Sequence, residues 1–163
     1  MSDELDNIPI VEGVSFDPMP YRGFKISIEK VWVDTNAINW YNGPVNDNGQ
    51  PTYNATSTET MHKVIIETYP LPKLDEKGEK TEDLVSFGTN EDGSPKPYRL
   101  THRFNLTKKD GVWSISKAPS AKCWAFMRKM GAEKLSDLKN KIVILDIKAD
   151  REDDTKHWLR INI

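Results

Sequence analysis

The chain contains a single cysteine, Cys123, among its 163 residues. One cysteine excludes an intramolecular disulfide and any zinc site made of several cysteines. No apolar run approaches the roughly 20 residues of a membrane span, and residues 1–20 lack the basic and apolar regions of a signal peptide. We therefore expect a cytoplasmic protein without membrane contacts, in which Cys123 is a small buried apolar residue on a helix face.

Catalytic motifs are also lacking. The sequence has no Gly-rich phosphate loop, no nucleophile elbow and no Cys/His pair at a useful spacing. His62, His102 and His157 fall on three different predicted strands, where scattered histidines are usually structural. The acidic turn at 150–154 does not match an EF-hand loop. The sequence thus predicts a protein that is not an enzyme and that needs neither a cofactor nor a metal.

Acidic residues are nearly absent from residues 94–131, which hold nine Lys and Arg residues and one acid, Asp110. This stretch has a net charge of +8 in a chain whose total is −2. Because screening limits phosphate attraction to roughly 10 Å, such a local concentration of charge indicates an anion-binding surface even in an acidic chain.

The same stretch has a readable secondary structure. Apolar and polar residues alternate over 98–107, which predicts a half-buried strand. Asp110-Gly111 then predicts a turn, and 112–116 a returning strand, so that a basic hairpin results. Apolar residues at helical spacing in 123–130 predict a helix that Ser120 caps and Gly131 ends.

The pattern over residues 1–69 predicts an arm, two strands and a long loop. Residues 1–20 contain acids, no base and three prolines, and are interpreted as a flexible acidic arm before one domain at 21–163. The apolar phase of the strand that begins at Phe24 slips near 29–31, which indicates a bulge. A polar loop at 34–60 follows, and then a strand at 61–69. Trp32 and Trp124 are expected in the core, whereas Trp40, Tyr41 and Tyr53 of the loop either stack on bases or fold back.

The order of elements predicts the fold. After a charged insertion at 73–97 with a short strand at 84–87, the basic strand and the helix lead to a short second helix at 133–138 and two closing strands at 142–149 and 156–163. Five strands with a helix between the third and the fourth is the order of the OB-fold. We predict a mainly β protein: an OB-fold-like five-stranded Greek-key barrel with one helix and an extra hairpin.

Residues 98–109 and 122–163 resemble phage-type single-stranded DNA-binding proteins of replication and recombination. The shared features are the basic strand 103–106, a helix ending in Met130-Gly131, the run 135–141 leading into strand 142–145, and a closing strand with Asn162. Relatives commonly carry an acidic C-terminal tail, whereas here the acidic segment is N-terminal, and the turn at 151–155 is acidic where a binding loop could be basic.

These observations predict largely sequence-independent binding of single-stranded DNA, because a cationic groove with flat aromatic rings is what single strands require. The candidate binding residues are Arg99, Arg103, Lys108, Lys109, Lys117 and Arg160 for phosphates, and Trp40, Tyr41, Trp113 and Trp158 for bases. RNA as the ligand, a homo-oligomer and a protein partner of the acidic arm stay open. The alternatives are a structural or adaptor β-barrel that docks an acidic protein, and a sandwich with an aromatic pocket for a sugar or small ligand.

Overall fold

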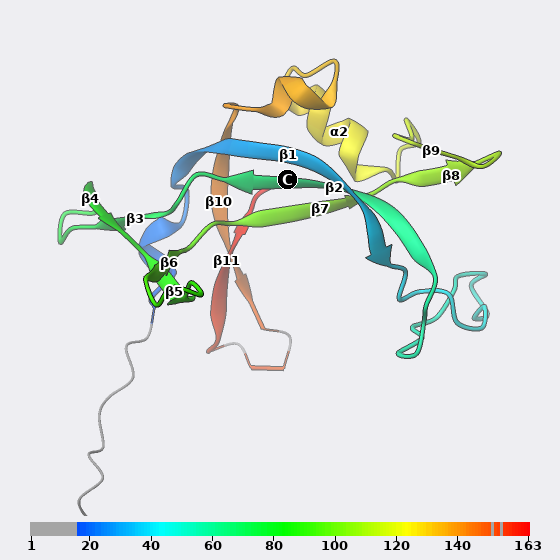
Figure 1. Cartoon of the computed structure of the whole chain (residues 1–163), viewed down its shortest axis with the longest axis horizontal. Coiled ribbons are helices and arrows are strands. Elements are labelled where there is room, and N and C mark those ends of the chain that lie inside the picture. Colours follow the sequence, from blue (N-terminus) through cyan, green and yellow to red (C-terminus); the bar gives the residue numbers. More distant parts are fainter. Residues whose placement is uncertain (1–15, 151, 154) are drawn as a thin grey trace, which may run out of the picture.

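A five-stranded antiparallel sheet dominates the computed structural model, which describes residues 16–150, 152, 153 and 155–163 (Figure 1). The strand order is β11-β10-β1-β2-β7. The strands are β1 (Lys25–Ile38), β2 (Thr60–Thr68), β7 (Thr101–Asn105), β10 (Ile142–Ala149) and β11 (His157–Ile161). The predicted mainly β class is confirmed, and so is the order of five principal strands with a helix between the third and the fourth.

The predicted slip in β1 is a β-bulge. Ile28 pairs with Thr68 and Lys30 pairs with Glu67, so that Glu29 is the extra residue on β1. Before the bulge β1 pairs with β10, and after it β1 continues along β2 as far as Ile38. The strand therefore extends further than expected, because 34–38 was interpreted as the start of a loop.

The core lies between this sheet and the helix α2 (Lys122–Lys129). Val64, Ile66 and Phe104 point to it from β2 and β7, and the ring of Phe104 stacks on Phe126 of α2 at 5.3 Å between centroids. The predicted N-cap is wrong, since the cap position is Ala121 and no side chain caps the helix. Gly131 ends the helix as predicted, with a φ of +70° that glycine adopts without strain.

The closed barrel that the sequence predicts is not formed. β7 and β11 are the two end strands of the sheet, and no hydrogen-bonded ladder joins them in the described part of the chain. In an antiparallel sheet of five strands the first and last run parallel, so that closure would need a parallel pairing. A cavity of about 280 Å³ lies between them instead, lined by His102, Lys122 and residues 160–163.

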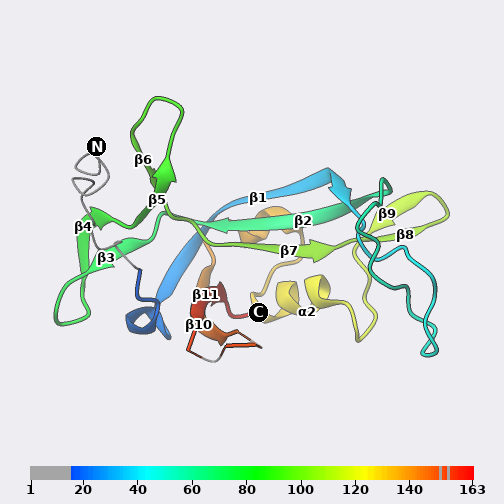
Figure 2. The same cartoon turned by 90° about the horizontal axis from the view of Figure 1, so that it is seen from below.

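Three small hairpins extend from the sheet (Figures 1 and 2). The predicted basic hairpin pairs β8 (Thr107–Lys109) with β9 (Val112–Ser114) through Asp110-Gly111, both of which have the positive φ of a tight hairpin turn. The insertion forms two hairpins instead of one short strand. They are β3 (Pro72–Leu74) with β4 (Lys80–Leu84), and β5 (Ser86–Thr89) with β6 (Pro95–Pro97).

The hairpins lie at opposite ends of the sheet. The insertion hairpins β3–β6 are at one end, and β8–β9 extends from the other end together with the loop at 39–59, as both views show (Figures 1 and 2). The predicted second helix is a 3-10 turn, η2 (Leu135–Leu138). None of the helices in the described ranges combines the length and the apolar content needed to span a bilayer.

The predicted acidic arm falls mainly on residues 1–15, which lie outside the described residues. Phe16 packs against the core, and the 3-10 turn η1 (Met19–Tyr21) leads into β1 with Tyr21 buried. The packed part of the chain therefore begins no later than Phe16, a few residues before the predicted domain boundary.

Candidate nucleic-acid interface

The outer face of β1, β2 and β7, turned away from the core, forms three rows of side chains. The middle row consists of Trp32, Ile65 and Arg103, which are direct cross-strand partners. Ile65 is only 4% exposed although it points away from the core, whereas Trp32 is 40% exposed. Side chains opposite one another in antiparallel strands are about 5 Å apart, so Trp32 and Arg103 flank Ile65 at contact distance.

Two further rows place charges beside Trp32. Asp34, Lys63 and Asn105 form the row on the side of the β8–β9 hairpin, and Lys30, Glu67 and Thr101 form the other. We call these three rows the outer sheet face. Its cations are Lys30, Lys63 and Arg103, and its acids are Asp34 and Glu67, so it is weakly cationic. Asp34 also accepts a hydrogen bond from the amide N–H of Asn36 at 2.9 Å.

The β8–β9 hairpin carries Lys108 and Lys109, which are both exposed. As neighbours in one strand they point to opposite faces of the hairpin, with Lys108 on the side of Trp113 and Lys109 on the other side. Among the described residues, neither these lysines nor Arg103 forms an ion pair with a carboxylate. Their charges are thus available to an anion. Arg103, Lys108 and Lys109 are therefore the predicted phosphate ligands on β7 and β8 that have no carboxylate partner in the described part of the chain.

The ring of Trp113 on β9 is already engaged within the chain. It stacks on His62 with ring centroids 4.7 Å apart and an interplanar angle of 21°. The ammonium of Lys108 lies 5.8 Å from the centroid of the same ring, a cation–π distance. One face of Trp113 is thus covered by imidazole, and a base could reach this ring only on its remaining surface.

The aromatic residues of the loop at 39–59 cluster with one another and do not fold into the core. Tyr53 lies 6.2 Å from Trp40 and 5.9 Å from Tyr41 between ring centroids, and Tyr41 and Tyr53 are 64% and 61% exposed. The loop is held by backbone hydrogen bonds such as Gly43 N–H to Thr52 O at 2.9 Å. A Cβ on Gly43 would lie 2.8 Å from that oxygen, so the loop requires glycine there.

Three of the predicted cations have partners of their own. Arg99 precedes β7 and pairs with Glu29, the bulge residue of β1, where both side chains are half-buried. Arg160 pairs with Asp146 across β10 and β11 at 3.2 Å. The ammonium of Lys117 lies 4.7 Å from the ring centroid of Trp124. A phosphate would have to compete with a carboxylate for Arg99 and Arg160.

Trp158 and Arg160 lie apart from the other candidates. They are exposed on β11, at the opposite edge of the sheet order from β7, with β10, β1 and β2 in between. The structure therefore divides the predicted site residues into one group around β7–β9 and the 39–59 loop, and a second group on β11.

Two residues of the outer sheet face were missed in the sequence. Trp32 was expected in the core, and Lys63 was not considered. The sequence contained a signal for both residues. The slip at 29–31 reverses which residues of β1 point outward. In β2, neighbouring side chains point to opposite faces, so Lys63 points outward where Val64 points to the core. Trp124, also expected in the core, is partly buried against it.

The titratable groups near this surface show two clear shifts. Burial, helped by the neighbouring positive charge of Arg103, lowers the pKa of His102 below its ordinary 6.5. Burial raises the pKa of the Cys123 thiol to about 11, so that this cysteine is unreactive at neutral pH. Within the described ranges, no cluster of three or more His, Cys, Asp or Glu side chains has the arrangement of a metal site.

Comparison of the chain with protein-family models, with curated proteins and with solved structures gave no match. The resemblance to phage-type single-stranded DNA-binding proteins accordingly stays a prediction from the sequence, and the function has to be argued from the geometry described above.

Proposed function

We propose that this chain is a non-catalytic protein that binds single-stranded DNA largely without sequence preference, in DNA replication, recombination or repair. The bound strand would run over the outer sheet face toward the β8–β9 hairpin. Phosphates would contact Arg103, Lys108, Lys109 and Lys63, and a base would stack on Trp32.

The strand order supports an OB-fold-like reading of the sheet. The strand order β11-β10-β1-β2-β7, with α2 between β7 and β10, supports this reading. In the OB-fold, strands 2 and 3 carry the usual ligand face. In this chain those strands are β2 and β7. The outer sheet face is therefore the surface that this fold would use for an oligonucleotide.

The observation that carries the proposal is the row of Trp32, Ile65 and Arg103, followed along the chain by Lys108 and Lys109 of the β8–β9 hairpin, which form no ion pair with any described carboxylate. An exposed indole beside cations without carboxylate partners combines a stacking platform with phosphate contacts. Single-stranded nucleic acid needs both, and sequence tolerance follows because every base has a flat face.

The test is a titration of the full chain with fluorescently labelled oligo(dT) at low and high salt. We expect an affinity that falls steeply with salt, since each neutralised phosphate adds about −0.7 to the slope of log K against log salt for a single strand. Trp32→Ala should weaken binding by about 1–3 kcal/mol without changing that slope, because it removes stacking and no charge. Absence of binding at low salt, or an affinity that does not change with salt concentration, would refute the proposal.

A further inference from the structure

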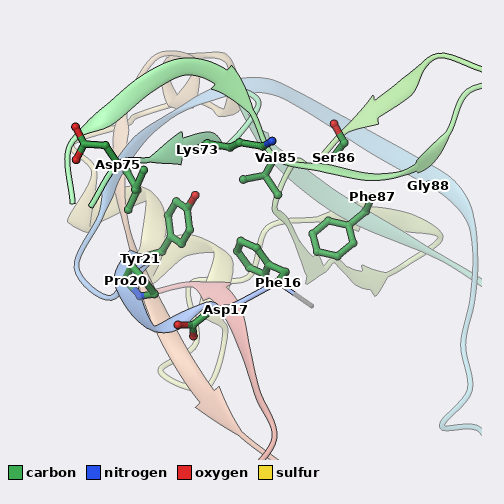
Figure 3. Close-up of a pocket in the computed structure, with 11 residues that line it drawn as sticks. Phe16, Asp17, Pro20, Tyr21, Lys73, Asp75, Val85, Ser86, Phe87 and Gly88 are labelled. Carbon is green, nitrogen blue, oxygen red and sulfur yellow. The ribbon is translucent and has the colours of Figure 1, made fainter. Parts of the chain in front are cut away.

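The insertion hairpins and the residues before β1 enclose a cleft of about 600 Å³ (Figure 3). Its volume is within the range of about 300–1,000 Å³ that ligand pockets have. Phe16 and Tyr21 line it from one side, and Val85 and Phe87 line it from β5 and the residue before it. The cleft lies at the end of the sheet opposite the β8–β9 hairpin, so it does not belong to the interface proposed above.

The aromatic walls of the cleft are held by ring contacts. Phe16 lies 5.5 Å from Tyr21 and 5.4 Å from Phe87, and Phe87 lies 4.7 Å from Tyr98, all between ring centroids. The hydroxyl of Tyr21 donates a hydrogen bond to the carbonyl oxygen of Pro72 at 2.7 Å. Phe87 nevertheless remains 45% exposed, and so offers an uncovered ring face to a ligand. Such rigid aromatic pockets are where a large apolar side chain of a partner gains most of its binding energy.

The charge around the cleft is acidic. Asp17, Asp75 and Lys73 line it, two acids against one base. The two hairpins as a whole, residues 72–97, hold seven acids and four bases. The carboxylates at the tips of the hairpins are exposed, so they remain available to a cationic ligand. This composition disfavours a nucleic acid and favours a positively charged partner, because complementary potentials guide association and suppress the wrong ligand.

We infer that this cleft binds a segment of a basic protein partner, in which one large apolar side chain enters between Phe16, Tyr21 and Phe87 and flanking lysines or arginines face the acidic hairpins. The chain would then hold a basic protein at one end of the sheet. The inference does not depend on what the outer sheet face binds.

The test uses a synthetic peptide with one tryptophan between pairs of lysines, labelled for fluorescence anisotropy, and the full chain. A peptide with alanine in place of tryptophan and a peptide with glutamates in place of lysines serve as matched probes. We expect saturable binding of the first peptide, and binding at least about tenfold weaker for each of the other two.

Two variants locate the binding. Phe87→Ala removes the exposed phenyl ring that lines the cleft. It should lower the affinity for the lysine–tryptophan peptide about tenfold or more. Asp75→Asn removes a charge while its side-chain oxygen can still accept the hydrogen bonds from the amides of Lys77 and Glu79, and should weaken the peptide several-fold, an effect that disappears at high salt. Val45→Ala, an exposed position in the 39–59 loop at the other end of the sheet, is the control and should leave the affinity for the peptide unchanged. Thermal unfolding verifies that each variant is folded.

Several results would overturn the inference. They are no saturable binding up to about 1 mM peptide, equal binding to Phe87→Ala, equal binding of the glutamate peptide, and displacement of the peptide by oligo(dT), which would assign the cleft to nucleic acid. Oligo(dT) titrations of the same variants keep the two proposals separate. Phe87→Ala should bind oligo(dT) like the unmodified chain, and failure of oligo(dT) binding in every variant would refute the proposed function alone.

Discussion

The cations of the proposed interface can be tested by the triple substitution Arg103→Gln, Lys108→Gln and Lys109→Gln. All three side chains are exposed and have no ion-pair partner among the described residues. Glutamine keeps the outward hydrogen-bonding capacity and much of the aliphatic length, and the core-facing neighbours such as Phe104 are untouched. The substitution should therefore remove three charges and lower the free energy of unfolding by no more than about 1 kcal/mol, most of it from the lost contact between Lys108 and the ring of Trp113.

The expected loss of affinity follows from counterion release. If each of the three side chains neutralises one phosphate, the slope of log K against log salt becomes less steep by about 2. At about 0.1 M salt the same relation assigns roughly a fivefold gain in K to each contact, so the triple variant should bind oligo(dT) about a hundredfold more weakly. At about 1 M salt the difference between the variant and the original chain should vanish.

The assay is anisotropy of labelled oligo(dT) over a series of salt concentrations, with two matched controls. The double substitution Asp146→Asn and Arg160→Gln removes an ion pair without changing the net charge, and Lys77→Gln with Lys80→Gln removes two charges from the insertion hairpins. Neither control should change the slope. A triple variant with an unchanged slope, or controls that lose as much affinity as the triple variant, would refute the assignment of phosphates to β7–β9.

Three other predictions use independent measurements. Tyr41→Ala with Tyr53→Ala should weaken the binding of oligo(dT) by about 1–3 kcal/mol for each base that stacks in the loop. Thermal unfolding should not change, because both rings are exposed. An unchanged affinity would exclude the loop from the interface. The lowered pKa of His102 means that the unfolded chain takes up this proton first as pH falls below 6.5, so the free energy of unfolding should decrease there; denaturant titrations at several pH values should find this dependence missing in His102→Gln. Cys123 should react with a thiol reagent far more slowly in the folded chain than in denaturant near pH 8, and equal rates would show that α2 opens readily.

The strands that have one buried face were predictable from the sequence. In β10 the buried Val143 and Leu145 lie on the face that alternation assigns to the core, and β2 is predicted by its run of β-branched residues, Val64 to Ile66, all of which are buried. The missing link between β7 and β11 was not predictable, because closure depends on how the sheet curls and not on any local pattern.

The insertion hairpins were missed because they have little core pattern. β4 is polar and mainly exposed, so neither of its faces imposes alternation. Turn chemistry was the available signal. Asp75 accepts hydrogen bonds from the amides of Lys77 and Glu79, and Gly78 has a φ of +79°. The same backbone turn returns at 90–93, where the amide of Gly93 donates to the carbonyl oxygen of Asn90 as that of Gly78 does to Asp75, and Gly93 has a φ of +84°. Two turns of this kind, correctly interpreted, would have predicted two hairpins.

The ion pairs were beyond sequence reasoning. Arg99 and Glu29 are 70 residues apart, and their contact depends on the way in which β1, β2 and the segment before β7 lie side by side. A count of charges along residues 94–131 therefore overstated the free positive charge. Arg99 is neutralised by a carboxylate from outside that stretch, and Lys117 faces the ring of Trp124.

The bulge at Glu29 connects the fold to the proposed interface. In a strand without it, side chains would keep alternating from Ile26 and Ile28, and Trp32 would point into the core while Val31 and Val33 pointed outward. The extra residue reverses this order, so that Val31 packs against the core and Trp32 joins Arg103 on the outer sheet face. Glu29 itself is left beside Arg99 and neutralises it. One inserted residue thus supplies the only indole of the outer sheet face within the described residues and removes one cation next to it, which places the cationic surface toward the β8–β9 hairpin.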